Sequence, residues 1–259
     1  HYFINDIGKK IALLVIGIEE YGLKDGNFSS ILDTYVKISN RAKEDESIDQ
    51  KAFYYLQQVE SGNTEMVQKF KEITDICVER QLQIFDTLDI HFDVFTHESD
   101  FVYNNYLDNI LKRLDKTGRL HEDELGRLYV DLSGYDIPTR EPVLVLTRSN
   151  KTSLYPMRDI AYTIHKIELN PKNNFIVLGE DQEVYMKQIS AVLDILGYKA
   201  PKLISYSYVL LDGDKMSTSA GTVVLVTDFM KAVKNTLVNE FNKRNSEISV
   251  DKLNILVNA

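Results

Sequence analysis

Apolar residues recur along this chain at spacings that predict helices in some segments and strands in others. Between residues 28 and 88 they lie three, four or seven positions apart, which is the spacing of one helix face, so consecutive helices are predicted there. A shorter helical pattern covers residues 11–18, after an aromatic, apolar run at residues 2–4 that predicts a strand. The clearest helical stripe contains Met66, Phe70, Ile73, Cys77, Ile84 and Leu88.

The second half of the chain predicts strands that alternate with helices. Strands are expected at residues 92–95 and 142–146, a helix at 106–114 that Gly118 closes, and a hairpin over 119–132 that turns near residues 124–126.

Residues 175–178 are wholly apolar, as in a strand that a parallel sheet buries on both faces. A helix with an apolar face from Ile189 to Leu196 follows, Gly197 ends it, and residues 202–206 predict another strand. Strand, helix and strand within about 30 residues predict a parallel βαβ unit. The expected fold is α/β, with a large, mainly helical insertion between two halves of an open sheet.

Composition narrows the class of protein. Hydrophobic residues make up 44% and charged residues 27% of the 259 positions, as is ordinary for a soluble globular protein, and no run approaches the roughly 18 apolar residues of a membrane span. The single cysteine, Cys77, excludes a disulfide framework and a Cys-rich zinc site, and its place on the apolar stripe predicts a buried thiol. We expect a cytoplasmic protein without a metal site of its own.

The net charge of −9 argues against indiscriminate nucleic-acid binding, because neutralising phosphates needs clustered Lys and Arg, although a local basic patch stays possible. The densely charged run at residues 41–46 is interpreted as a solvated helix face rather than a binding site.

Three segments carry candidate chemistry. The first, Gly179-Glu180-Asp181-Gln182, follows the apolar strand, at the edge of an open sheet where ligands bind. Glycine allows close approach to the backbone, Asp181 can accept hydrogen bonds from ribose hydroxyls, and Gln182 can both donate and accept. An ordinary helix start with Asp as its cap is the plain alternative.

The second segment is Tyr155-Pro156-Met157-Arg158-Asp159. Pro156 suits the first turn of a helix, where Tyr155 and Asp159, four positions apart, project to the same side. A carboxylate beside a phenol forms a receptor for a guanidinium, which it holds through a pair of hydrogen bonds. In the alternative interpretation, Asp159 pairs with a Lys or Arg of the protein itself.

The third segment, residues 212–222, is rich in glycine and hydroxyl side chains and contains Lys215. Its backbone amides and hydroxyls can wrap a polyphosphate while the lysine supplies charge, or it is a plain surface turn. The spacing is not that of a Walker loop.

In this order the segments resemble class I aminoacyl-tRNA synthetases, and arginyl-tRNA synthetase in particular. Residues 215–219 (KMSTS) resemble the class I Lys-Met-Ser-Lys-Ser loop, and residues 179–182 its Gly-x-Asp-Gln segment. Residues 147–161 are similar to the arginyl signature Arg-Ser-Asp-Gly-Thr-Ser-Leu-Tyr…Arg-Asp-Ile-Ala. Residues 2–8 resemble its Tyr-Val-Asn-Asp-x-Gly segment, and Phe92-Asp93 with Glu98-Ser99 its Phe-Asp…Glu-Ser pair.

The resemblance implies a Rossmann-like open parallel sheet and an arginine–tRNA ligase. Such an enzyme activates L-arginine with Mg-ATP and transfers it to tRNA-Arg, generally with the tRNA already bound. Tyr155 and Asp159 would bind the guanidinium of arginine, and Gln182 its amino-acid end. The ATP-binding residues would be Gly179, Asp181, Lys215, Met216 and Ser217, and the catalytic loop would use Lys215, Ser217, Thr218 and Ser219.

The resemblance also has gaps. No His-x-Gly-His motif is present, and Thr218 and Ser219 replace the second lysine and the arginine found in related loops. In the family the missing motif and the first strand precede the segment that matches Tyr2, so we expect them upstream of His1 and expect this fragment to be inactive alone. The predicted domains are a catalytic domain over residues 1–226, with an insertion at about 28–133, and the start of a helical anticodon-binding domain over 227–259.

Two other functions stay open. A class I synthetase of another specificity shares the ATP segments but would not place Tyr and Asp in this turn. A non-catalytic, synthetase-derived tRNA-binding or scaffold module would explain the missing motif, although it would not need Tyr155, Asp159 and Gln182 together. The expected partners are L-arginine, ATP and tRNA-Arg, the last mainly through parts outside this chain, and the protein is expected to be a monomer without a membrane contact.

Overall fold

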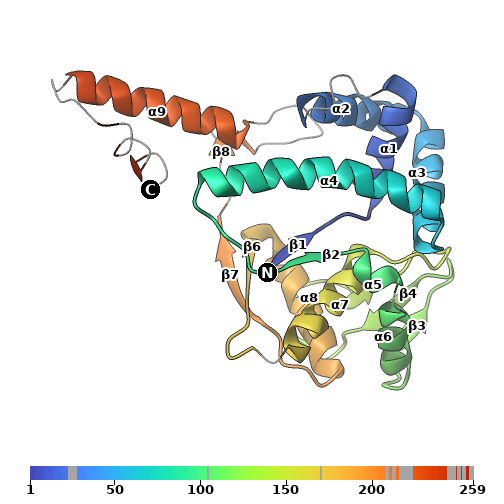
Figure 1. Ribbon diagram of the computed structural model, residues 1–259. Helices are drawn as coiled ribbons and strands as arrows, with labels where there is room; N and C mark the ends of the chain where they lie inside the picture. The colour runs from blue at the N-terminus through green and yellow to red at the C-terminus, as the bar shows by residue number, and fades with distance from the viewer. Residues whose placement is uncertain are drawn as a thin grey trace.

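A computed structural model gives the arrangement of the chain (Figure 1). It describes residues 1–22, 28–103, 105–169, 171–207, 210–211, 214–215, 224–243, 249, 252 and 255–256. Among the described residues, no helix has the length and apolar character that crossing a membrane requires.

Four helices from the first third of the chain pack around one hydrophobic core. They are α1 (Lys9–Tyr21), α2 (Phe28–Glu44), α3 (Glu46–Glu60) and the long α4 (Thr64–Thr87), as the periodicity predicted. Asp45 and Asn63 begin α3 and α4, because their side chains accept hydrogen bonds from backbone amides of the first turns. Ile16, Ile38 and Leu56 lie at the centre of this core.

The charged run at residues 41–46 crosses the end of α2 and the start of α3, and its charged side chains are exposed, which agrees with its interpretation as a solvated surface. Cys77, on α4, packs against the edge of the core and is half-buried rather than fully buried. Partial burial raises the pKa of its thiol, because the thiolate loses hydration there.

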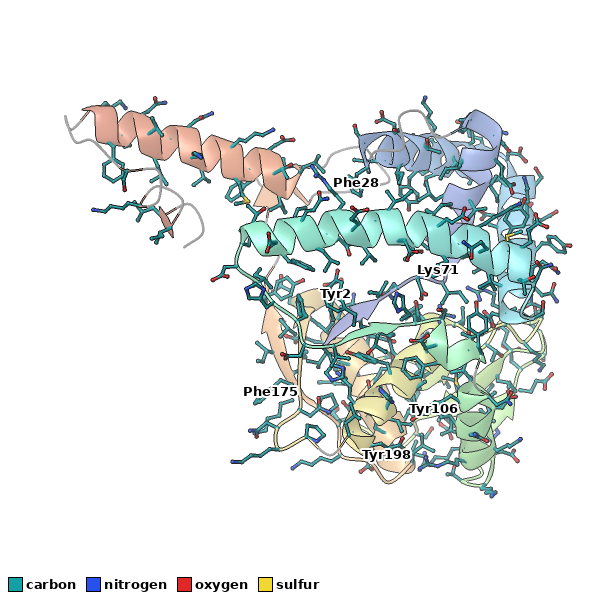
Figure 2. The ribbon with its side chains drawn as sticks, in the orientation of Figure 1. Tyr2, Phe28, Lys71, Tyr106, Phe175 and Tyr198 are labelled. Carbon is teal, nitrogen blue, oxygen red and sulfur yellow. The ribbon has the colours of Figure 1, made fainter. Side chains whose placement is uncertain are left out.

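Strand β1 (Tyr2–Ile4) pairs in parallel with β2 (Phe95–His97). The prediction of a strand at residues 92–95 was therefore wrong at all but its last residue. Pairing fixes the position of β2, since Tyr2 lies opposite Phe95 and Ile4 opposite His97. Phe92 instead joins an aromatic cluster with Tyr2 and with Phe85 of α4. Figure 2 shows Tyr2 below that helix.

The predicted hairpin is present as β3 (Leu120–Glu122) and β4 (Leu128–Asp131), and β5 (Val143–Val145) extends it into a three-stranded antiparallel sheet. The short helix α5 (Asp100–Tyr103) and the predicted helix α6 (Tyr106–Asp115) precede it. This sheet shares a second hydrophobic core with α6, α7 (Tyr155–Glu168) and α8 (Glu183–Ile195), centred on Leu114, Leu146, Ile160 and Leu193.

The predicted βαβ unit consists of β6 (Phe175–Gly179), the 3-10 turn η1 (Glu180–Gln182), α8 and β7 (Lys202–Tyr206), with the two strands parallel. The prediction that β6 is buried on both faces was wrong. Ile176 and Leu178 pack against the second core, whereas Phe175 and Val177 are 50% and 60% exposed. Within the described residues, other elements pack only against the face of β6 that carries Ile176 and Leu178. Figure 2 shows Phe175, on the other face, at the outer side of the molecule.

The end of the chain contains α9 (Val226–Lys243), which extends away from the other helices in Figure 1. It begins one residue before the stretch, 227–259, that was predicted to start a helical domain, and most of it lies within that stretch. Before it, β8 (Leu210–Leu211) and β9 (Asp214–Lys215) form a short antiparallel pair. The predicted domain boundaries, at about 28, 133 and 226, stay predictions.

Candidate functional site

A cavity of about 530 Å³ lies between β1, α7, β6 and α8. Tyr155, Asp159 and Gln182, the three residues predicted to form one pocket, all line it. Phe3 and Asn5, from β1 and the residues that follow it, line another side. The polar groups therefore come from distant parts of the sequence, with Asn5 and Gln182 177 positions apart, and line one cavity.

The first turn of α7 positions two of these side chains. The helix begins at Tyr155 with Pro156 next, as predicted, because a proline at this position lacks only an N–H that would have no partner within the helix. The amide of Met157 donates to the carbonyl of Leu154 and closes the turn. Tyr155 is 55% exposed and Asp159 is partly buried one turn later. Both reach the cavity, which confirms that the spacing of four puts them on one side.

Asp159 is held by a phenol. The hydroxyl of Tyr185, on α8, donates a hydrogen bond to Asp159 Oδ2 at 2.5 Å, and the Tyr185 ring lies 5.2 Å from that of Tyr155. Among the described residues Asp159 forms no ion pair, so its pairing with an internal Lys or Arg, the alternative raised by the sequence, is not found.

Burial governs the electrostatics of the cavity. Loss of hydration raises the pKa of Asp159, and the hydrogen bond from Tyr185 opposes that rise. The pKa of Tyr185 is also raised, because its phenolate would be buried and would face the Asp159 carboxylate. Lys166, two turns further along α7, lines the cavity with Nζ 4.6 Å from the centre of the Tyr162 ring, and burial lowers its pKa.

Gly179, Asp181 and Gln182 lie together where β6 ends. A Cβ atom on Gly179 would lie 2.6 Å from Asp181 Oδ1, so a side chain at this position would displace that carboxylate from the strand end. Gln182 donates from Nε2 to Asp181 Oδ2 at 2.7 Å, which fixes the orientation of its amide. Asp181 is exposed, at the carboxyl edge of the parallel pair, where a ligand can reach it.

A buried polar network supports the cavity. Arg158 donates from Nε to Glu98 Oε1 at 2.6 Å, and both side chains are almost inaccessible to solvent. Asn5 donates to the other oxygen of Glu98, and the amide and hydroxyl of Ser99 donate to Asp6. Burial raises the pKa of Glu98 to about 7, although Arg158 acts in the opposite direction. The segments at residues 2–8 and 98–99, singled out separately in the sequence, therefore meet beside the cavity.

Sequence reasoning missed Tyr185 and gave no role to Glu98 or Arg158. Tyr185 lies three positions after Gln182, a spacing that puts both on one side of the turn leading into α8, and this is the signal that was available. No local pattern indicates that Glu98 meets Arg158, because 60 residues separate them.

The loop at residues 212–222 is described only at Asp214 and Lys215, whose backbones form β9. The predicted site residues Met216, Ser217, Thr218 and Ser219 lie outside the described residues. Their roles, and that of Lys215, stay predictions.

Taken together, the arrangement can recognise a cationic group. The Asp159 carboxylate, oriented by the Tyr185 hydroxyl, lines the same cavity as the Tyr155 ring. The side-chain amide of Gln182, at the end of β6, also lines it. A planar guanidinium can donate two hydrogen bonds to such a carboxylate, and the ring can lie against its face. Within the described ranges, no three His, Cys, Asp or Glu side chains gather to hold a metal ion.

Comparison with known families gives one match along the whole chain. The family described as "tRNA synthetases class I (R), catalytic domain" matches residues 1–259. Among curated relatives, the arginine–tRNA ligase of Archaeoglobus fulgidus is 30% identical over 248 residues, which cover 95% of this chain and 44% of that protein. The arginine–tRNA ligase of Methanococcus maripaludis strain C6 is 32% identical over 250 residues, or 94% of this chain and 43% of that protein. The chain thus spans less than half the length of these relatives.

Solved structures show the same fold. The arginyl-tRNA synthetase of Thermus thermophilus superposes with a TM-score of 0.75 at 20% identity, covering 99% of this chain and 49% of that one. That of Plasmodium falciparum gives a TM-score of 0.68 at 15% identity, covering 100% of this chain and 43% of that one. At these identities the likeness shows the fold alone.

Proposed function

The chain belongs to the family of class I tRNA synthetase (R) catalytic domains, where R denotes arginine, and we propose that it is the central part of an arginine–tRNA ligase. One observation carries the proposal: Tyr155, Asp159 and Gln182 converge on one cavity, where Asp159 is bonded to a phenol and forms no ion pair with any cation of the described part of the chain. The carboxylate is therefore available to an external guanidinium.

In this proposal the cavity binds free L-arginine. Asp159 accepts two hydrogen bonds from the guanidinium, and the exposed ring of Tyr155 aligns its plane. Gln182, whose Nε2 is bonded to Asp181, turns its carbonyl oxygen toward the α-amino group. Lysine is disfavoured because a single ammonium cannot satisfy the carboxylate in the same forked geometry.

ATP is proposed to bind at the carboxyl edge of β6 and β7. The exposed carboxylate of Asp181 and the close backbone approach at Gly179 suit ribose hydroxyls. Lys215 to Ser219 would close over the triphosphate, with Lys215 and the hydroxyls of Ser217, Thr218 and Ser219 as the catalytic groups and Met216 beside the nucleotide. Mg²⁺ bound with ATP would neutralise phosphate charge, and no protein ligand for it is proposed.

The proposed reaction has two steps. The arginine carboxylate attacks the α-phosphorus of ATP, which forms arginyl-adenylate and releases pyrophosphate. A hydroxyl of the terminal ribose of tRNA-Arg then attacks the arginyl carbonyl and AMP leaves. The protein acts by orienting the reactants and stabilising charge, with little acid–base work. The cytoplasmic location, the monomeric state and the start of an anticodon-binding domain at residue 227 are further parts of this proposal.

The open edges of the sheet support the expectation that this part is inactive alone. In the described part of the chain the parallel pairs β1–β2 and β6–β7 are separate sheets, and both β1 and β6 line the cavity. The proposed first strand, with the His-x-Gly-His motif after it, would complete the sheet there.

Exchange of pyrophosphate into ATP tests the proposal. The protein at its natural length should exchange in the presence of arginine and tRNA-Arg, and not with lysine, isoleucine or cysteine. The 259-residue chain should give no exchange under the same conditions. Exchange with another amino acid would refute the specificity. Binding of tRNA without any arginine-dependent exchange would favour the scaffold module instead.

A further inference from the structure

Ser153, two residues before α7, is bonded to charged side chains through each of its polar groups. Its amide donates to Glu60 Oε2 at 2.9 Å and its hydroxyl to Glu60 Oε1 at 3.3 Å. Its carbonyl accepts from Nη1 of Arg148 and Nη1 of Arg158, both at 2.7 Å, and its hydroxyl oxygen also accepts from Arg158 at 2.8 Å. A buried serine is thus the meeting point of one carboxylate and two guanidinium groups.

Glu60 comes from the other half of the molecule. It is the last residue of α3, which belongs to the core of α1–α4, and it lies 93 positions before Ser153. Burial raises the pKa of its carboxyl group, and the Ser153 amide and the two guanidinium groups oppose the rise. The same helix touches this segment a second time, since the Phe53 ring lies 5.4 Å from the Arg148 guanidinium.

The contact lies at the helix end that carries the cavity residues. Leu154, the residue before α7, provides no side-chain cap, and the Glu60 carboxylate is bonded to the amide of Ser153, two residues before the helix begins. A negative charge there is favourable, because the first amides of a helix carry partial positive charge. Arg158 extends the same chain of contacts to the residue next to Asp159.

Both ends of the first turn are therefore fixed by one chain of contacts. Glu60 holds Ser153, which lies two residues before Tyr155, and Ser153 holds Arg158, which lies one residue before Asp159. Displacement of Ser153 would move the phenol and the carboxylate together. Gln182, at the end of β6, instead donates to Asp181, a bond that belongs to the other edge of the site.

We propose that Glu60 is a positioning residue for the arginine pocket, through which the packing of the α1–α4 helices sets the geometry of the turn that carries Tyr155 and Asp159. This inference rests on the proposed function. It makes a specific demand: loss of Glu60 must weaken arginine recognition while ATP recognition, at the other edge of the site, is preserved.

The test compares Glu60→Ala and Glu60→Gln with wild type, all at natural length, in arginine- and tRNA-dependent pyrophosphate exchange. Glu46→Ala is the matched control, because Glu46 is an exposed carboxylate at the opposite end of α3. Glu60→Ala should raise the KM for arginine about tenfold, equivalent to ~1.4 kcal/mol, with the KM for ATP within about twofold of wild type. The arginine KM of Glu60→Gln should lie between those of wild type and Glu60→Ala, because the glutamine side-chain oxygen can still accept from the Ser153 amide.

Equal changes in both KM values, or an arginine KM at the wild-type level in Glu60→Ala, would overturn the inference. Should Glu60→Ala fail to fold, the arginine-to-ATP KM ratio of Glu60→Gln decides: a raised ratio supports the inference and an unchanged ratio overturns it. Wild-type protein without arginine-dependent exchange would overturn the proposed function and this inference together. If the wild type is active and the Glu60 variants keep its arginine KM, only the inference about Glu60 is overturned and the proposed function stands.

Discussion

The hydroxyl of Tyr185 donates to Asp159 Oδ2 at 2.5 Å, across the space between α8 and α7. Among the described residues this is the one hydrogen bond to the Asp159 side chain, so its remaining acceptor sites can serve a ligand. The bond also opposes the protonation that burial favours. The carboxylate that is proposed to select arginine is thus oriented by a neighbouring helix.

Tyr185→Phe should weaken arginine recognition and shift its pH dependence. Without the phenol the pKa of Asp159 rises further, because a hydrogen bond to its ionised form is lost. The arginine KM should increase about tenfold at neutral pH, since hydrogen bonds to charged groups are worth about 1.5–3 kcal/mol. The acidic limb of the kcat/KM profile should move to higher pH.

Tyr135→Phe is the matched control for this variant, since Tyr135 donates a similar bond to Asp194 on the surface, away from the cavity. A Tyr185→Phe profile that superposes on that of the control would contradict a role for Tyr185 in orienting Asp159.

Asp159→Asn should weaken arginine binding by about 2–4 kcal/mol, the scale for removing one partner of a desolvated charge pair. Its amide is neutral and cannot accept both hydrogen bonds of the guanidinium fork. The arginine KM of the natural-length protein measures the effect, and Asp194→Asn is the control. An unchanged arginine KM would remove Asp159 from the pocket.

Glu98 should make stability depend on pH. Its pKa in the folded protein is about 7, above the ordinary value of 4.5, so ionisation is harder in the folded state than in the unfolded state. This contribution to stability is complete below pH 4.5 and is lost as pH rises toward 7. Relative to Glu98→Gln, the free energy of unfolding of the wild type should fall by at most about 3 kcal/mol over this pH range.

Urea unfolding at several pH values between 4.5 and 7.5 measures this difference, with Glu46→Gln as the control for an exposed carboxylate. The inference fails if the difference in unfolding free energy between wild type and Glu98→Gln stays constant, or shifts in favour of the wild type, as pH rises. That result would show that Arg158 keeps Glu98 ionised throughout.

Gly17→Ala should destabilise the α1–α4 core. An added Cβ would lie 2.8 Å from Thr34 Cγ2 and 3.2 Å from Ile38, so α1 and α2 would have to separate. Overpacking of this kind costs about 1–3 kcal/mol, and the better helix propensity of alanine offsets up to about 1 kcal/mol. Thr34→Ser removes the obstructing methyl group, so the double variant should recover stability in thermal or urea unfolding. If the changes in unfolding free energy of the two single variants simply add in the double variant, this clash is excluded.

Several elements could be predicted because their information is local. The helices between residues 28 and 87 follow from apolar spacing, α7 follows from Pro156 and the spacing of Tyr155 and Asp159, and the βαβ unit follows from one apolar run, one helical face and Gly197. Local signals failed where a partner decides the outcome. The register of β2 depends on β1, and the exposure of Val177 depends on which elements cover β6.

The sequence by itself determined the helices of residues 28–87, the βαβ unit, that α7 presents a phenol and a carboxylate on one side, and the family resemblance. Only the tertiary structure decided which distant side chains bind one another. Tyr185 donates to Asp159, and Arg158 donates to Glu98. The Ser153 amide donates to Glu60, which belongs to the other core. The reason is physical. Backbone periodicity fixes the direction of a side chain relative to its own element, whereas its partner depends on how distant elements pack, and short-range patterns do not encode that packing.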